Sequence, residues 1–213
     1  MSNITPRVAA FLLLLVVPRL VAADAQVTVL DANGQPVAGA GVAVYVPRGV
    51  QPQAELDVMD QRNEAFVPDF LVVTAGAEVS FPNSDQVLHH VYSFSPAKTF
   101  ELPLYRGMLP SPVHFDHEGI VVIGCNIHDH MIGHVWVVDT TLHALTDANG
   151  VAHFAELPAG RYRTLAWHPR AGKSGVKETL LETSATGNGA ASIELAVSKQ
   201  VAERGALTWR DSY

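Results

Sequence analysis

The sequence predicts an all-β protein, and three observations support this fold class. Runs of β-branched and aromatic residues recur along the chain in alternation with other residues, for example at Val42–Val46 and His134–Val138. The 213 residues include 16 glycines and 13 prolines, a composition that favours many short strands and turns over long helices. Helical periodicity is almost absent after the N-terminal segment. Many short strands at close spacing indicate a sandwich or a barrel.

The N-terminal residues are typical of a secretory signal peptide, which we expect to span residues 1–23. Arg7 supplies the positive start, Val8–Val17 is an unbroken apolar run, and small residues follow, so that cleavage after Ala23 or after Ala25 fits. The apolar run is too short to span a bilayer. We therefore expect an exported, periplasmic protein whose mature chain does not insert into a membrane. An uncleaved membrane anchor is the alternative.

Charge and cysteine content narrow the functional classes. The formal net charge is −7 and no basic run occurs, which argues against nucleic acid as a partner. Cys125 is the only cysteine, so the chain cannot form an internal disulfide. An exported thiol of this kind is either buried and inert or bound to a metal, and its sequence neighbours decide between the two.

The residues around this cysteine predict a metal site. Cys125, His128 and Met131 follow one another at intervals of three residues and place a thiolate, an imidazole and a thioether on one tight loop. One thiolate, two imidazoles and a distant thioether are the ligands of blue-copper electron-transfer centres. A second imidazole must come from elsewhere, and His89 and His90 follow a turn-rich loop. Adjacent strand residues point to opposite faces, so only one of these two histidines can face the metal.

These motifs resemble the plastocyanin and amicyanin branch of the cupredoxins. The resemblance is carried by the pattern Phe66-x-Pro-x-x-Leu-x-Val-x-x-Gly-x-x-Val-x-Phe-x-Asn83, by His89, and by Cys125-x-x-His128-x-x-Met131. It implies a Greek-key copper domain at residues 59–139 that holds one type 1 copper ion. It also implies that His89, six positions after Asn83, is the first ligand, with Cys125, His128 and a weak Met131 completing the set. The position after the first ligand is usually asparagine in that family and here is His90.

Segments outside this domain resemble a second family. Asp31–Gly34 and Asp147–Gly150 share the sequence Asp-Ala-Asn-Gly, in which Asn-Gly can adopt the positive φ that a tight hairpin requires. Their surroundings resemble strands of the carboxypeptidase-regulatory, transthyretin-like sandwich. We expect a small sandwich that begins at residues 24–58, is interrupted by the copper domain, and resumes at 140–213. The alternative is two unrelated hairpins attached to one larger sandwich.

Several other side chains near the motifs have less specific interpretations. We interpret Asn83 and Asp85 as groups that brace a loop. We interpret Trp167-His-Pro-Arg as a strand end with a turn, in preference to a contact with the copper domain. Core or apolar-rim positions are expected at Tyr92, Phe94 and Tyr105. Solvated or hydrogen-bonded histidines, with a second copper site as the alternative, are expected at His114, His117, His130 and His134.

The sequence therefore predicts a periplasmic type 1 copper protein that carries single electrons between redox partners. A group of bacterial proteins labelled methylamine utilisation proteins is similar at Leu88–Lys98 and around Cys125, and the label implies a redox partner such as a cytochrome or a copper or quinone enzyme. The alternative is a copper-binding or delivery module without an electron-transfer role. We do not expect an enzyme, because a copper oxidase or nitrite-type reductase needs a second copper with an open position. The sequence does not determine the oligomeric state.

Overall fold

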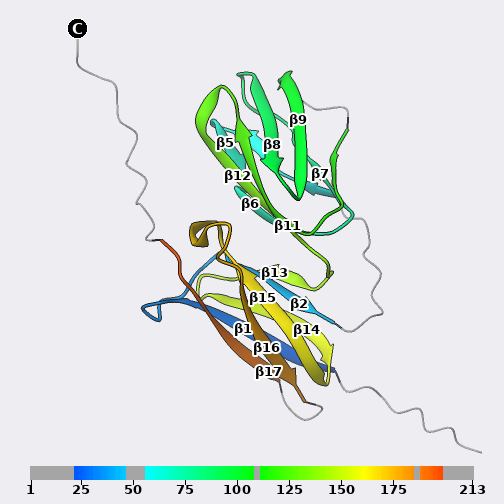
Figure 1. Ribbon diagram of the computed structural model, residues 1–213, viewed down its shortest axis with the longest axis vertical. Helices are drawn as coiled ribbons and strands as arrows, with labels where there is room; N and C mark the ends of the chain where they lie inside the picture. Colours follow the sequence, from blue (N-terminus) through cyan, green and yellow to red (C-terminus); the bar gives the residue numbers. More distant parts are fainter. Residues whose placement is uncertain (1–21, 47–55, 108–110, 185–187, 199–213) are drawn as a thin grey trace, which may run out of the picture.

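The computed structural model describes residues 22–46, 56–107, 111–184 and 188–198 (Figure 1). Within these ranges the only helix is one short 3-10 turn at Pro169–Ala171, and the other elements are strands, so the predicted all-β class is confirmed. None of the described residues form a helix that is long and apolar enough to cross a membrane. The predicted signal peptide lies outside the described residues except for Ala22 and Ala23, which begin strand β1.

One sandwich is built from the central part of the chain. Its strands are β3 (Leu56–Val58), β4 (Asp60–Arg62), β5 (Ala65–Val67), β6 (Phe70–Thr74), β7 (Ala77–Ser80), β8 (His89–Ser95), β9 (Lys98–Tyr105), β10 (Val113–Phe115), β11 (Gly119–Cys125) and β12 (His128–Val138). A five-stranded sheet has the order β6-β12-β11-β8-β9, a three-stranded sheet has the order β10-β7-β3, and β4 pairs with β5. Val91, Ile123 and Val135 of the larger sheet and Val79 of the smaller one belong to the same buried apolar cluster.

A second, smaller sandwich is built from the two ends of the chain. Its strands are β1 (Ala22–Asp31), β2 (Gly41–Tyr45), β13 (His143–Leu145), β14 (Val151–Pro158), β15 (Gly160–Trp167), β16 (Lys177–Thr183) and β17 (Gly189–Leu195). They form the sheets β14-β1-β17 and β13-β2-β15-β16. Figure 1 shows this unit in blue, yellow and orange below the green central unit. The central sandwich is thus inserted between β2 and β13 of the small one, as the sequence predicted.

Two details of this arrangement differ from the sequence analysis. Residues 24–58 were assigned to the small sandwich, but Leu56–Val58 forms β3 and pairs in parallel with β7 of the central unit. In the two Asp-Ala-Asn-Gly turns only the glycines, Gly34 and Gly150, have positive φ, both at 73°. The aspartate side chains hold these turns: each carboxylate accepts two backbone N–H groups, those of Asn33 and Gln35 in the first turn and of Asn149 and Val151 in the second.

The two sandwiches meet in a buried apolar cluster of their own, here called the junction cluster. Phe70, Val72, Trp136 and Val138 from the central unit pack with Ala43, Leu165 and Trp167 from the small one. The rings of Phe70 and Trp167 meet edge to face, with centroids 5.2 Å apart. The Trp167 Nε1–H donates to the carbonyl of Gly172 at 2.8 Å. Trp167 does end a strand before a turn, but the expectation that it avoids the copper domain was wrong, because its ring is part of the junction.

Candidate metal centre

The β11–β12 hairpin brings Cys125 and His128 together. Both residues lie at the end of the hairpin, where they are register partners, and the register shifts by a bulge between Gly124 and Cys125. A bulge redirects the side chains that follow it. Cys125 is 3% exposed and belongs to the buried cluster of the central sandwich, whereas His128 is only partly buried.

His89 reaches the same point from the neighbouring strand. It is the first residue of β8, which pairs with β11 on one side and β9 on the other. Burial alternates along β8, and His89 is on the inward face with 0% exposure. His90 therefore points to the other face, where its Nε2 lies 2.9 Å from Oε1 of Glu101.

The three side chains form a compact triangle of ligand atoms. His89 Nδ1 and His128 Nδ1 are 3.0 Å apart, and Cys125 Sγ is 3.6 Å from His128 Nδ1 and 4.0 Å from His89 Nδ1. First-row metal ions bind imidazole nitrogen at about 2.0 Å and thiolate sulfur at about 2.3 Å, so two ligands of one ion lie at most ~4.0 Å (N and N) or ~4.3 Å (N and S) apart. All three separations meet this limit, so the triangle can hold one metal ion.

Met131 is placed on the buried side of β12 with 1% exposure. It belongs to the same apolar cluster as Cys125, and both residues line one hollow of the surface. Burial in the same cluster as the thiol is compatible with a weak thioether ligand, but a core methionine has the same burial. The role of Met131 as the fourth ligand stays a prediction.

The loop before His89 is held by side-chain hydrogen bonds. Asn83 donates from Nδ2 to the carbonyls of Val87 and Tyr105, both at 2.9 Å, and its Oδ1 accepts the N–H of Asp85 at 2.9 Å. The β4–β5 hairpin adds backbone bonds: Gln61 N–H donates to the carbonyl of Pro82, and the N–H of Ser84 donates to Gln61. Asn83 thus braces the loop as expected.

Asp85 does more than brace the loop. Its Oδ2 lies 2.8 Å from His89 Nε2, the ring nitrogen that faces away from the triangle. Burial opposes ionisation of this carboxyl group, but the hydrogen bonds from Glu64 N–H, His89 and Asn63 N–H outweigh it and hold the pKa of Asp85 below its usual value. A carboxylate that accepts from the second nitrogen leaves Nδ1 of His89 unprotonated and available to a metal.

The sulfur and its surroundings are also constrained by neighbours. The backbone N–H of His90 points at Cys125 Sγ at 3.5 Å, so this residue contributes its main chain to the site while its ring lies outside.

Tyr105, partner of His89 across the β8–β9 pair, donates its hydroxyl to the carbonyl of Phe81. Burial raises the pKa of Tyr105 to about 12, so this hydroxyl remains a neutral donor.

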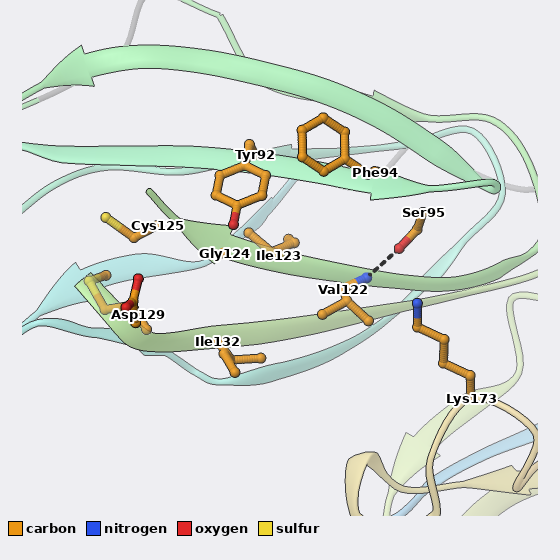
Figure 2. A pocket seen from close by; sticks show the side chains of 11 residues that line it. Tyr92, Phe94, Ser95, Val122, Ile123, Gly124, Cys125, Asp129, Ile132 and Lys173 are labelled. Carbon is orange, nitrogen blue, oxygen red and sulfur yellow. Dashed lines mark hydrogen bonds between the residues drawn. The ribbon is translucent and has the colours of Figure 1, made fainter. Parts of the chain in front are cut away.

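An open hollow of about 330 Å³ lies on the outer face of the five-stranded sheet and reaches Cys125 and Asp129 at one end. Figure 2 shows Tyr92 and Phe94 along one side and Lys173 of the small sandwich at the opposite end. Phe94 is 77% exposed, so the expectation of a core position is wrong for this residue. A Cβ atom at Gly124 would lie 3.1 Å from the Tyr92 hydroxyl, so the tyrosine covers the backbone next to Cys125.

The other histidines named from the sequence do not join the triangle. His114 is exposed. His117 and His130 are largely exposed, and His130 lies 3.4 Å from Glu64. Burial lowers the pKa of His134, whose ring lies 5.8 Å from that of Trp167 at the junction. In the part of the chain that the structure describes, one group of three or more histidine, cysteine, aspartate or glutamate residues is close enough to share a metal ion. It consists of His89, Cys125 and His128.

Comparisons with known proteins give structural similarity only. A scan against protein families and a search of curated proteins find no match to this sequence. Among solved structures, a reduced Cu(I) form of the P52G mutant of amicyanin is similar, with 19% identity over 46% of this chain and 98% of that one and a TM-score of 0.36. A purple cupredoxin from Nitrosopumilus maritimus shares 23% identity over 40% of this chain and 100% of that one, with a TM-score of 0.34. A copper-containing nitrite reductase from Thermus scotoductus SA-01 shares 21% identity over 54% of this chain and 28% of that one, with a TM-score of 0.38.

Proposed function

We propose that this protein binds one copper ion at His89, Cys125 and His128, with Met131 as a weak fourth ligand, and transfers single electrons outside the cytoplasm. The observation that carries the proposal is the ligand triangle, in which two imidazole nitrogens converge on the thiol of Cys125, a member of the buried apolar cluster of the central sandwich. A thiolate with two imidazoles suits both oxidation states of copper. When bound, the metal supplies a centre that gains and loses one electron.

The chain holds these ligands in a form that suits electron transfer. His89 is fixed from behind by Asp85, and Cys125 is at the end of a strand that is hydrogen-bonded along its length. Ligands held in place before the metal changes oxidation state limit the rearrangement that accompanies electron transfer. Burial of His89 and Cys125 also limits the access of solvent and competing ligands to the centre.

The edge of the site is suited to a transient partner. His128 is the only one of the three ligands that is partly exposed, and it gives an electron a path to the surface. Exposed apolar residues neighbour the ligands along the chain, with Leu88 beside His89 and Ile127 beside His128. Weak electron-transfer complexes use small interfaces of this kind. Exposed acidic groups such as Glu64, Glu101 and Asp129 would attract a basic or haem-bearing partner at low salt.

Voltammetry of the copper-loaded protein tests this role against copper delivery. We expect a reversible one-electron wave and an unchanged copper content after repeated cycles in the presence of a Cu(I) chelator. Loss of the copper to the chelator on reduction would instead support the delivery alternative. The same measurement on zinc-loaded protein is the control, because zinc fits a thiolate and imidazole site and has no redox chemistry.

A further inference from the structure

The contacts of Asp85 extend beyond those of a loop-bracing residue. Its Oδ2 accepts from Nε2 of His89 at 2.8 Å and from the backbone N–H of Glu64 at 2.9 Å. Its Oδ1 accepts the N–H of Asn63 at 2.6 Å. The carboxylate thus has three hydrogen-bond donors and joins the β4–β5 hairpin to the buried imidazole.

The hairpin turn explains why two of these donors are available. Asn63 and Glu64 have φ values of 53° and 54° and lie between Arg62 and Ala65, which are register partners. Two successive positive φ values mark a two-residue type I′ turn. Glutamate rarely adopts this conformation, so the turn is strained at Glu64. Asp85 accepts from both turn amides, so its position is set by the hairpin as well as by His89.

We propose that Asp85 is a positioning residue for the copper ligand His89 and lowers the reduction potential of the centre. The carboxylate leaves His89 Nδ1 directed at Cys125 and His128, and hydrogen bonding to a carboxylate makes an imidazole a more basic ligand. The negative charge also favours the oxidised ion, which carries one more positive charge than the reduced ion. The inference rests on the proposed copper site and assigns a residue that tunes it.

A second histidine on the same strand provides a matched control. His90 Nε2 lies 2.9 Å from Oε1 of Glu101, a contact of the same type and nearly the same length. The His90 ring is on the opposite face of β8, outside the triangle, and the Glu101 side chain is 69% exposed. Asp85→Asn and Glu101→Gln therefore each remove one negative charge next to a histidine, but only the first histidine reaches the proposed ligand position.

The potential of the two copper-loaded variants tests the proposal. Outer partners of metal-bound histidine change metal affinity by about 10- to 100-fold. We expect Asp85→Asn to weaken Cu(II) binding about tenfold relative to Cu(I), which for one electron is a rise in potential of about 59 mV. Glu101→Gln should leave the potential close to the wild-type value. Equal shifts in both variants, or no shift in Asp85→Asn, would overturn the proposal.

The effect of Asp85→Asn on protein stability must be measured separately from its effect on the reduction potential. An asparagine side chain cannot accept from all three donors, so the substitution also destabilises the β4–β5 turn. Glu64→Gly relieves the strain, because glycine adopts a positive φ freely, and keeps the amide N–H that Asp85 accepts. The Asp85→Asn change is therefore also made in the Glu64→Gly background. Recovery of stability with the potential still raised supports a tuning role. Return of the potential together with the stability would show that Asp85 acts only on the turn.

Metal-free protein gives a readout that does not depend on copper chemistry. In nitrogen-15 NMR spectra we expect His89 to carry its proton on Nε2, with slow exchange that is lost in Asp85→Asn and kept in Glu101→Gln. A proton on Nδ1, or the same exchange rate in all proteins, would overturn the pairing. If wild-type protein fails to form a copper centre but keeps this signal, the proposed function fails while the Asp85–His89 contact stands.

Discussion

Replacing Gly41 by alanine tests whether the two sandwiches share the junction seen in the structure. A Cβ atom at Gly41 would lie 2.7 Å from Cγ2 of Val72 and 2.9 Å from Cε3 of Trp136, both in the central unit. Side chains do not approach so closely, so the junction must open or repack. Overpacking of this kind costs about 1–3 kcal/mol of unfolding free energy.

Val72→Ala removes the closest of these atoms and turns the test into a double-mutant cycle. Alone it deletes two carbon atoms at a site that is 8% exposed, which costs about 1.6 kcal/mol at ~0.8 kcal/mol per carbon, plus a cavity term. In the double variant the new methyl group occupies part of the vacated space. We expect the combined loss to be smaller than the sum by at least about 0.5 kcal/mol. The rescue is partial because Trp136 remains.

Urea unfolding followed by circular dichroism and tryptophan fluorescence measures the four free energies of the cycle. Additivity within about 0.3–0.5 kcal/mol would refute the reasoning, because it would mean that the two residues do not touch. The copper spectrum serves as an internal control. Strand β12 runs from His128 at the ligand triangle to Val138 at the junction, a distance of about 33 Å at ~3.3 Å per residue. The spectrum should therefore remain unchanged in all folded variants.

Four substitutions in and beside the proposed centre have stated expected outcomes. Cys125→Ser should abolish the intense thiolate-to-copper absorption, and survival of the colour would contradict the assignment. His89→Ala should abolish it too, whereas His90→Ala should only shift the spectrum because the ring lies outside the triangle and the backbone N–H is retained; the reverse result would move the ligand to His90. Met131→Leu should keep the colour and raise the potential measured by voltammetry, and complete loss of copper would show that Met131 is more than a weak ligand.

The grouping of His89, Cys125 and His128, the three proposed ligands, was predictable because each residue lies in a local sequence pattern. Cys125 and His128 share one tight loop, and strand alternation required a choice between His89 and His90. The structure places His89 inward and His90 outward. Sequence alone could not place Met131, since burial of a methionine is expected in a core as well as at a metal.

Features that depend on distant contacts were not predictable. Asp85 was interpreted as a loop brace, and its bond to His89 requires the hairpin at Asn63 and Glu64 to hold the carboxylate from the other side. Two positive φ values at residues other than glycine give no strong sequence signal. Only the structure shows that Asp85 lies against His89 and that Glu101 lies against His90.

Domain organisation was predictable from the repeated turn motif, but not in detail. The shared Asp-Ala-Asn-Gly segments indicated one sandwich split by an insertion, and the sheet order agrees. The boundary was misplaced at β3 because three residues carry too little pattern to show that they pair with β7. Trp167 was read as a local strand end, since its contacts with Phe70 and Trp136 come from a distant part of the chain.

The most direct test of the central claim is a visible and electron-spin-resonance spectrum of the purified protein with one equivalent of Cu(II). The convergence of His89, Cys125 and His128 predicts an intense blue or green band and a narrow copper hyperfine splitting, both of which would come from a bond between copper and the Cys125 thiolate. A pale spectrum with ordinary splitting would contradict the account, because it would show that the thiol is not a ligand and that the triangle does not form a type 1 centre.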